Sequence, residues 1–252
     1  MRRAGHLTAR CLDGVADIIK DDMPLADINT YVLDFAASHD AMPATLGYKG
    51  YAYACCTSVN HVVCHGFPNE KTLRTGDIVN VDVTLILDGW FGDSSRMFAV
   101  GKPTRAAERL IQIAHEAMRR GIEAVRPGAH LGDIGHAIQA YARSERTGVV
   151  RDFCGHGIGQ VFHDSPNILN FGWPGAGPEL REGMIFTVEP MINLGRGDVK
   201  LLPDDWTVVT RDRSLSAQFE HSIGVTATGY EIFTLSTTGR HAPGVEVKAF
   251  TI

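Results

Sequence analysis

Apolar positions recur at two spacings along the chain, and the pair of patterns occurs twice. Residues 25–36 and 131–142 share apolar positions at helical intervals, with an offset of 106 residues. Residues 73–82 and 180–189 share a Leu-Arg-x-Gly start and a β-branched stretch that ends in Asp82 or Glu189, with an offset of 107. Two matches in the same order predict two related α+β halves, each running from helix to strand.

An amphipathic helix is expected at the start of each half. In the first half its apolar face holds Leu7, Cys11, Val15 and Ile18; in the second it holds Leu110, Ile113, Ala117 and Ala124. The second helix is expected to end at the Pro-Gly stop signal of residues 126–128. No Pro- or Ser-rich linker separates the halves, so we expect one domain over 1–252, with halves of roughly 1–100 and 104–252 packed about a pseudo-twofold axis.

The composition is that of a globular protein with a large core. Hydrophobic residues make up 44% and charged residues 21% of the 252 residues. The net charge of −5 argues against nucleic acid as a partner, and the lack of an apolar run of about 20 residues argues against a membrane span. The five cysteines are odd in number and lack C-x-x-C spacing, which favours reduced thiols and a cytoplasmic location.

Two aspartates are predicted to share one face of a hairpin. Residues 78–87 are typical of a buried strand, and Asp88-Gly89 is a strong two-residue turn signal. Paired residue numbers then add up to 177, which puts Asp93 opposite Thr84 and Asp82 opposite Ser95. The two residues become diagonal neighbours with Cβ atoms up to about 7–8 Å apart, close enough for both carboxylates to reach one cation. The alternative is a solvated turn at Asp93 and an ion pair between Asp82 and an arginine such as Arg96.

Two glutamates and one histidine carry further candidate chemistry. Glu189 ends the apolar stretch 184–188, and Glu220 lies in the segment 215–221, where an unpaired carboxylate is costly. His156 stands between glycines, which let the backbone approach a crowded centre. Taken singly, the acids are more typical of salt bridges and the histidine of a turn or core position. Together, they favour a metal site.

The donor set predicts two divalent cations. Four carboxylates contribute a charge of −4, which two divalent ions would cancel. Oxygen-rich ligation with one imidazole and no thiolate suits Mn, Fe, Co or Zn, and does not resemble a structural zinc site. Paired metals about 3.5–4 Å apart are used by hydrolytic enzymes to activate water.

The combined motifs closely resemble the bacterial-type (type I) methionine aminopeptidases of metallopeptidase family M24, over nearly the whole chain. They are VVCHGFP at 62–68, GDIVNVDV at 76–83, GD at 92–93, CGHGIG at 154–159, FTVEPM at 186–191 and SLSAQFEH at 214–221. The resemblance implies the α+β pita-bread fold, with two pseudo-symmetric halves around a central antiparallel sheet. It also implies that five residues bind two metal ions: Asp82, Asp93, His156, Glu189 and Glu220.

Further roles follow from the same resemblance. Glu189 would shuttle a proton, His163 would bind the substrate carbonyl and the developing oxyanion, and His65 would lie near the peptide nitrogen. On sequence alone, His163 is more typical of a surface residue and His65 is equally typical of a turn. The methionine pocket would be formed by Tyr48, Tyr51, Cys56, Phe162 and Trp206, which could otherwise be core residues.

The implied activity is removal of the N-terminal methionine from peptides and nascent chains when the second residue is small. Ala52-Tyr53-Ala54 and His61 depart from the family pattern near the expected substrate mouth. The rival hypotheses are an Xaa-Pro aminopeptidase or prolidase-like hydrolase, and a non-catalytic pita-bread binding module. A monomer is expected, and association with the ribosome is left open.

Overall fold

Four long helices form two pairs, one in each half of the chain. The structure is a computed structural model, and it describes residues 1–241. The first pair is α1 (Arg2–Ile18) and α2 (Leu25–Ala37), and the second is α3 (Arg105–Glu123) and α4 (Leu131–Ser144). Helix α3 ends earlier than the stop signal at 126–128 predicted. Its last turn tightens, because the Ala124 N–H donates to the Gly121 carbonyl at 3.2 Å.

Within the described residues, the strands pair antiparallel and form four hydrogen-bonded sheets. Their bounds are as follows. The first sheet holds β1 (Met42–Pro43), β2 (Cys56–Val59), β4 (Ile78–Leu87) and β5 (Trp90–Ala99); the second holds β15 (Tyr230–Ile232), β14 (His221–Val225), β9 (Ile185–Val188), β7 (Gly155–Gly157) and β8 (Asp164–Ile168); the third holds β13 (Ser216–Gln218), β10 (Met191–Asn193) and β6 (Gly148–Val149); and the fourth holds β11 (Val199–Leu201), β12 (Val208–Thr210) and β3 (Val62–Cys64). A short 3₁₀ turn, Tyr48–Gly50, precedes β2.

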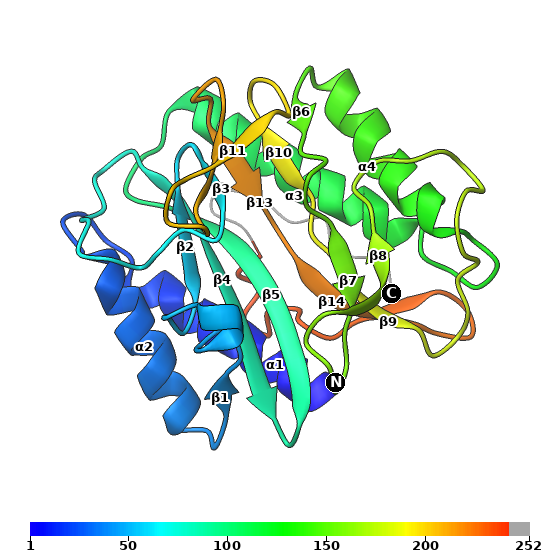
Figure 1. The fold of residues 1–252 in the computed structure, drawn as a ribbon, viewed down its shortest axis with the longest axis horizontal. Helices are drawn as coiled ribbons and strands as arrows, with labels where there is room; N and C mark the ends of the chain where they lie inside the picture. The colour runs from blue at the N-terminus through cyan, green and yellow to red at the C-terminus, as the bar shows by residue number, and fades with distance from the viewer. Residues whose placement is uncertain (242–252) are drawn as a thin grey trace.

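The segments that repeat in sequence form equivalent elements. Leu25 and Leu131 begin α2 and α4, and Ile78 and Ile185 begin β4 and β9. In Figure 1 the N-terminal elements α1, α2, β4 and β5 lie on the left, and α4, β7, β8 and β9 lie on the right. The prediction of two related helix-then-strand units is therefore confirmed at the level of these elements.

Each half packs its own apolar core. One cluster joins α1 and α2 to β4 and contains Leu12, Ile28 and Val81, all fully buried. The other joins α3 and α4 to the strands of the second half and contains Leu110, Ile134 and Phe186. Burying apolar area of this kind is the main favourable contribution to folding, so each ladder of strands rests on a rigid helical layer.

Two smaller observations bear on the sequence predictions. None of the helices within residues 1–241 is long and apolar enough to span a membrane. All five cysteines, which lie within the described residues, are free thiols.

Candidate active site

The β4–β5 hairpin carries Asp82 and Asp93 in the predicted register. Asp93 lies opposite Thr84, and Asp82 lies opposite Ser95. The Thr84 hydroxyl donates a hydrogen bond to Asp93 Oδ1 at 2.7 Å. The two-residue turn at Asp88-Gly89 therefore places both carboxylates on one face of the hairpin, as the alternation of side chains requires.

Arg96 does not neutralise Asp82, which excludes the ion-pair alternative. Its guanidinium donates to Asp13 of α1 at 2.8 Å, in a buried ion pair. Among residues 1–241, no Lys or Arg forms an ion pair with Asp82, Asp93, Glu189 or Glu220. The four acids are thus left without a cationic side chain.

A second ladder carries the two glutamates. Val188 pairs with His221 in β9 and β14, and Met191 pairs with Gln218 in β10 and β13. Both pairs belong to one register, so Glu189 and Glu220 face each other in the gap between the two paired regions. The gap coincides with Pro190, which has no N–H to donate to a ladder.

The two ladders are joined where the second one opens. The Glu220 N–H donates to the Ser95 carbonyl at 3.0 Å, and the Ser94 hydroxyl donates to the Glu220 carbonyl at 2.7 Å. The Ser222 hydroxyl donates to the Asp93 carbonyl, also at 2.7 Å. These contacts fix the carboxylates of one half against those of the other.

His156 reaches this centre from β7, which lies between β8 and β9. A Cβ at Gly155 would lie 2.3 Å from the Thr187 carbonyl oxygen, and one at Gly157 would lie 2.3 Å from that of Ser165, so both positions require glycine. The His156 Nδ1 lies 3.1 Å from the Gly157 carbonyl oxygen. Because a carbonyl only accepts, Nδ1 carries a hydrogen, and Nε2 is the ring nitrogen that faces the acids.

The donor atoms converge closely enough to hold a metal. His156 Nε2 lies 3.6 Å from Asp93 Oδ2 and 3.7 Å from Glu189 Oε1. One ligand atom each from Asp93, His156 and Glu220 lies within 4.8 Å of the others. Asp82 and Glu189 line the same cavity as these three residues. All five predicted ligands are therefore brought together, and this donor set fits divalent cations.

Electrostatics give a physical reason for a cation here. Burial raises the pKa of Asp82, Asp93, Glu189 and Glu220 above the usual carboxyl range. The negative charge of Asp93 raises the pKa of the other three further. A divalent ion would remove both penalties, because it replaces the lost hydration and screens the like charges.

Two threonines were not singled out from the sequence, although both touch the acids. The Thr187 hydroxyl donates to Glu189 Oε1 at 2.7 Å and accepts from the backbone N–H of His156 at 3.0 Å. Thr84 plays the matching part for Asp93. The signal was available, since Thr187 stands two residues before Glu189 and therefore on the same face of the strand. Gln218, which donates to Glu189 Oε2 at 3.3 Å, likewise stands two residues before an acid, Glu220.

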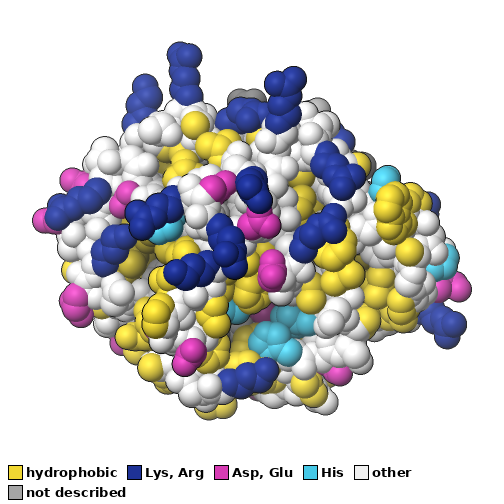
Figure 2. Space-filling view, turned by 45° about the horizontal axis from the view of Figure 1, so that its top comes forward, with side chains coloured by type: hydrophobic (Ala, Val, Ile, Leu, Met, Phe, Trp, Pro, Cys, Tyr) yellow, Lys and Arg dark blue, Asp and Glu magenta, His cyan; other side chains and the backbone are white. Residues whose placement is uncertain are grey.

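The predicted substrate residues line one cavity of about 310 Å³ above the acids. Figure 2 shows histidine side chains gathered in a hollow bordered by apolar groups. The cavity contains all seven predicted positions: Tyr48, Tyr51, Cys56, His65, Phe162, His163 and Trp206. It also contains Thr45, Lys49, Asp152, Phe153, Cys154 and Met191, which we did not predict.

Aromatic contacts hold the walls of this cavity. Tyr51 meets Trp206 edge-on with ring centres 4.9 Å apart, and Tyr48 packs on Phe162 at the same distance. His163 lies 4.2 Å from the ring centre of His156. Burial is the main cause that lowers the pKa of His163 to about 3, so its imidazole is neutral at pH 7. Burial also lowers the pKa of His65.

The atypical residues do not themselves line the substrate cavity, although Tyr53 contacts two residues that do, Thr45 and Tyr51. His61 lies in the turn between β2 and β3, where its carbonyl accepts from the Thr210 N–H at 3.0 Å. Tyr53 packs behind the cavity wall, against Tyr51 and Phe67. Neither His61 nor the segment 52–54 is among the residues that line the cavity.

Comparisons with known proteins agree with this geometry. The pattern of the family described as Metallopeptidase family M24 matches residues 1–227. A methionine aminopeptidase from Rickettsia prowazekii is 59% identical over 94% of this chain and 92% of its own length, and one from Escherichia coli K12 is 46% identical over 93% and 90%.

Solved structures show the same fold. The crystal structure of the Rickettsia prowazekii methionine aminopeptidase matches with a TM-score of 0.92, over 93% of this chain and 95% of that one. Prolidase from Pyrococcus furiosus matches with a TM-score of 0.71 at 19% identity, over 93% of this chain and 62% of its own, which shows the fold alone. The predicted pita-bread fold is confirmed, and the chain belongs to metallopeptidase family M24, alongside its bacterial methionine aminopeptidases.

Proposed function

We propose that the protein is a metal-dependent aminopeptidase that removes the N-terminal methionine from peptides and nascent proteins whose second residue is small. One observation carries this proposal: four buried carboxylates and His156 converge at the floor of a cavity with apolar, aromatic walls. Relatives at 46–59% identity are named methionine aminopeptidases, which favours this activity over the Xaa-Pro and non-catalytic alternatives.

Five residues would hold a pair of divalent ions: Asp82, Asp93, His156, Glu189 and Glu220. The bound ions would supply Lewis-acid activation of water and of the scissile carbonyl. The contribution of the chain is to hold these ligands in place, with hydroxyl donors on Asp93 and Glu189. Co, Mn, Fe and Zn all suit this donor set.

Glu189 is the proton carrier in the proposed reaction. Its Oε1 accepts from the Thr187 hydroxyl at 2.7 Å, and its Oε2 accepts from the Gln218 amide at a longer 3.3 Å. The carboxylate can therefore take the proton of the attacking water at Oε2 and deliver it to the departing amine nitrogen.

The two cavity histidines would position the peptide. A neutral His163 can donate one N–H to the substrate carbonyl oxygen as negative charge develops there. His65 lies beside Trp206, with ring centres 6.0 Å apart, and would contact the peptide nitrogen. Tyr48, Tyr51, Cys56, Phe162 and Trp206 offer aromatic edges and a thiol to the methionine thioether.

The test is release of methionine from Met-Ala-Ser by protein reconstituted with each metal in turn. We expect cleavage of Met-Ala-Ser and none of Ala-Ala-Ser or of Xaa-Pro peptides. Faster cleavage of Xaa-Pro peptides would favour the prolidase-like hypothesis. Failure to cleave any peptide with any metal would favour a binding module.

We further propose that the substrates include nascent chains at the ribosome, and that the protein is a monomer in the cytoplasm. The chain as a whole carries a charge of −5, but Lys and Arg side chains are spread over the face that holds the histidine hollow (Figure 2), and this face suits an RNA-rich surface. Co-sedimentation with ribosomes should occur at low salt and weaken as salt is raised. Light scattering should give the monomer mass near 27.4 kDa.

A further inference from the structure

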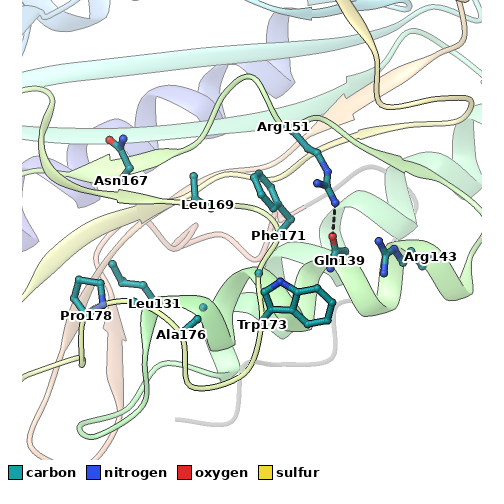
Figure 3. Close-up of a pocket in the computed structure, with 13 residues that line it drawn as sticks. Leu131, Gln139, Arg143, Arg151, Asn167, Leu169, Phe171, Trp173, Ala176 and Pro178 are labelled. Carbon is teal, nitrogen blue, oxygen red and sulfur yellow. Dashed lines mark hydrogen bonds between the residues drawn. The ribbon is translucent and has the colours of Figure 1, made fainter.

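A second cavity, of about 380 Å³, lies in the C-terminal half between α4 and the segment 167–178. It shares no lining residue with the active-site cavity. Its walls are mostly apolar, and two arginines enter it at one end (Figure 3). Concave, mainly apolar sites with a few polar groups are the usual form of small-molecule sites.

The outer wall of this cavity is fixed against α4. The Gly132 N–H donates to the Ala176 carbonyl at 2.8 Å, and the Gly175 N–H donates to Asp133 Oδ1 at 2.8 Å. A Cβ at Gly132 would lie 2.4 Å from the Trp173 carbonyl oxygen, and one at Gly135 would lie 2.3 Å from that of Phe171. Two glycines of α4 thus let the segment lie directly on the helix, and the cavity is formed before any ligand arrives.

The arginines have no acidic partner. Arg151 lies 4.4 Å over the Phe171 ring and donates at 2.8 Å to the amide oxygen of Gln139 (Figure 3). Within residues 1–241, Arg143 has neither an ion pair nor a side-chain hydrogen bond, and no carboxylate pairs with Arg151. Figure 3 shows both guanidinium groups extending toward Gln139, beside the Trp173 ring.

Arg120 shows the ordinary arrangement for comparison. It lies 4.3 Å over the Tyr141 ring, almost the same distance as Arg151 from Phe171, but it donates to the Glu116 carboxylate at 2.6 Å. The cavity arginines therefore retain unused capacity for an anion, and a guanidinium fork matches a carboxylate or phosphate in geometry.

The aromatic side of the cavity is unusually open. Trp173 is 75% exposed and Leu169 is 41% exposed. An exposed indole beside two uncompensated guanidiniums can stack on a flat ring while the arginines bind an attached anionic group.

We propose that this cavity binds a small organic anion, in which a planar aromatic ring is joined to a carboxylate or phosphate group. The ring lies on Trp173 and the anionic group lies between Arg143 and Arg151. This site is separate from the metal centre, so the proposal is independent of the peptidase activity.

The test uses anilinonaphthalene sulfonate, an aromatic anion whose fluorescence reports binding, with the intact protein. We expect saturable binding that weakens with salt, and about tenfold weaker binding for Arg143→Met with Arg151→Met and for Trp173→Ala. Displacement by indole acetate would indicate a carboxylate ligand, and displacement by adenosine monophosphate a phosphate ligand.

Matched variants separate this cavity from other dye sites. Arg120→Met removes a ring-stacked guanidinium elsewhere and should leave binding unchanged, as should Trp206→Leu in the active-site cavity. Binding by the double arginine variant at wild-type strength would overturn the proposal. So would loss of dye binding in Trp206→Leu, or a dimer by light scattering that Trp173→Ala dissociates.

Discussion

The two ladders of strands supply two carboxylates each, but they place them by different means. In the first, Asp82 and Asp93 are diagonal neighbours in an unbroken hairpin closed by a two-residue turn. In the second, Glu189 and Glu220 face each other in a gap between two paired regions, and the chain between the strands runs through β11 and β12. Related halves can thus meet at one centre although only one of them has a locally determined register.

This difference between the ladders also indicates different roles for their acidic residues. The continuous ladder holds Asp82 and Asp93 in a fixed relation, which suits metal ligands. The open ladder leaves Glu189 with one firmly held oxygen and one weakly held oxygen, which suits a group that both binds metal and moves a proton. We therefore expect the equivalent acids of the two halves, Asp82 and Glu189, to respond differently to amide substitution.

The largest effect is expected from Glu189→Gln. Turnover of Met-Ala-Ser should fall about 10²–10⁴-fold at every metal concentration, because the proton carrier is lost. Asp82→Asn should also impair turnover, but excess metal should restore part of it, since only a ligand is weakened. Steady-state kinetics across a metal titration, with exposed Glu182→Gln as control, checks this. Equal rescue of both variants would remove the distinction between the ladders.

The histidines contributed by the two halves provide the next comparison. His163→Ala should lower kcat about 10²–10³-fold with metal content unchanged, as expected for one lost oxyanion donor. His65→Ala should act more on KM, since its expected contact is to the ground-state peptide nitrogen. Metal analysis beside the kinetics decides the matter: loss of metal from His163→Ala would make that residue a ligand instead.

Thr84 and Thr187 each donate a hydroxyl hydrogen bond to an acid of one ladder, so their removal compares how much such a bond contributes to metal affinity in the two ladders. Thr84→Val and Thr187→Val should each weaken metal binding about 10–100-fold, the range known for partners of metal ligands. Thr187→Val should have the larger effect, because the Thr187 hydroxyl contacts both Glu189 and the backbone N–H of His156. Competition with a fluorescent chelator measures both, with exposed Thr30→Val on α2 as control. If both variants bound metal as tightly as the parent protein, these hydroxyl contacts would not contribute to metal binding.

The smallest effect concerns the helices behind the ladders. Helix α1 buries Asp13 against Arg96, whereas α3 buries His115 edge-on against Phe219, with ring centres 5.2 Å apart. Burial lowers the pKa of His115 to about 4 from 6.5. Between pH 6.5 and 4, His115 is therefore protonated in the unfolded chain but neutral in the folded protein. The free energy of unfolding consequently falls as the pH falls from about 6.5 towards 4.

Urea unfolding at pH 7 and pH 5 measures this loss. His115→Gln should remove about 2 kcal/mol of the difference between the two pH values. An identical pH dependence in the variant and the parent protein would contradict the assignment to His115.

The sequence was informative wherever the chain folds locally. The Asp88-Gly89 turn determined the register of β4 and β5, and periodicity located the four long helices. The register of Glu189 and Glu220 was inaccessible, because residues 194–215 separate the paired strands and no turn rule spans that length. The segment 215–221 also divides into β13 and β14, since Glu220 bonds to β5 instead of its own ladder.

Tertiary contacts explain the remaining differences. His61 and Tyr53 are close in sequence to cavity residues, but they do not line the cavity, and Tyr53 packs on Phe67 and Tyr51. The second cavity is lined by Arg143, Arg151 and Trp173, and no local sequence motif links these positions. By contrast, Thr187 was within reach of sequence reasoning, because strand alternation alone places it beside Glu189.

Anomalous scattering from crystals of the metal-loaded protein tests the central claim most directly. We predict two peaks about 3.5–4 Å apart, with Asp82, Asp93, His156, Glu189 and Glu220 as their ligands. Peaks bound elsewhere, or a loaded centre from which Asp82 and Glu220 point away, would contradict the proposal that the two ladders build one metal site.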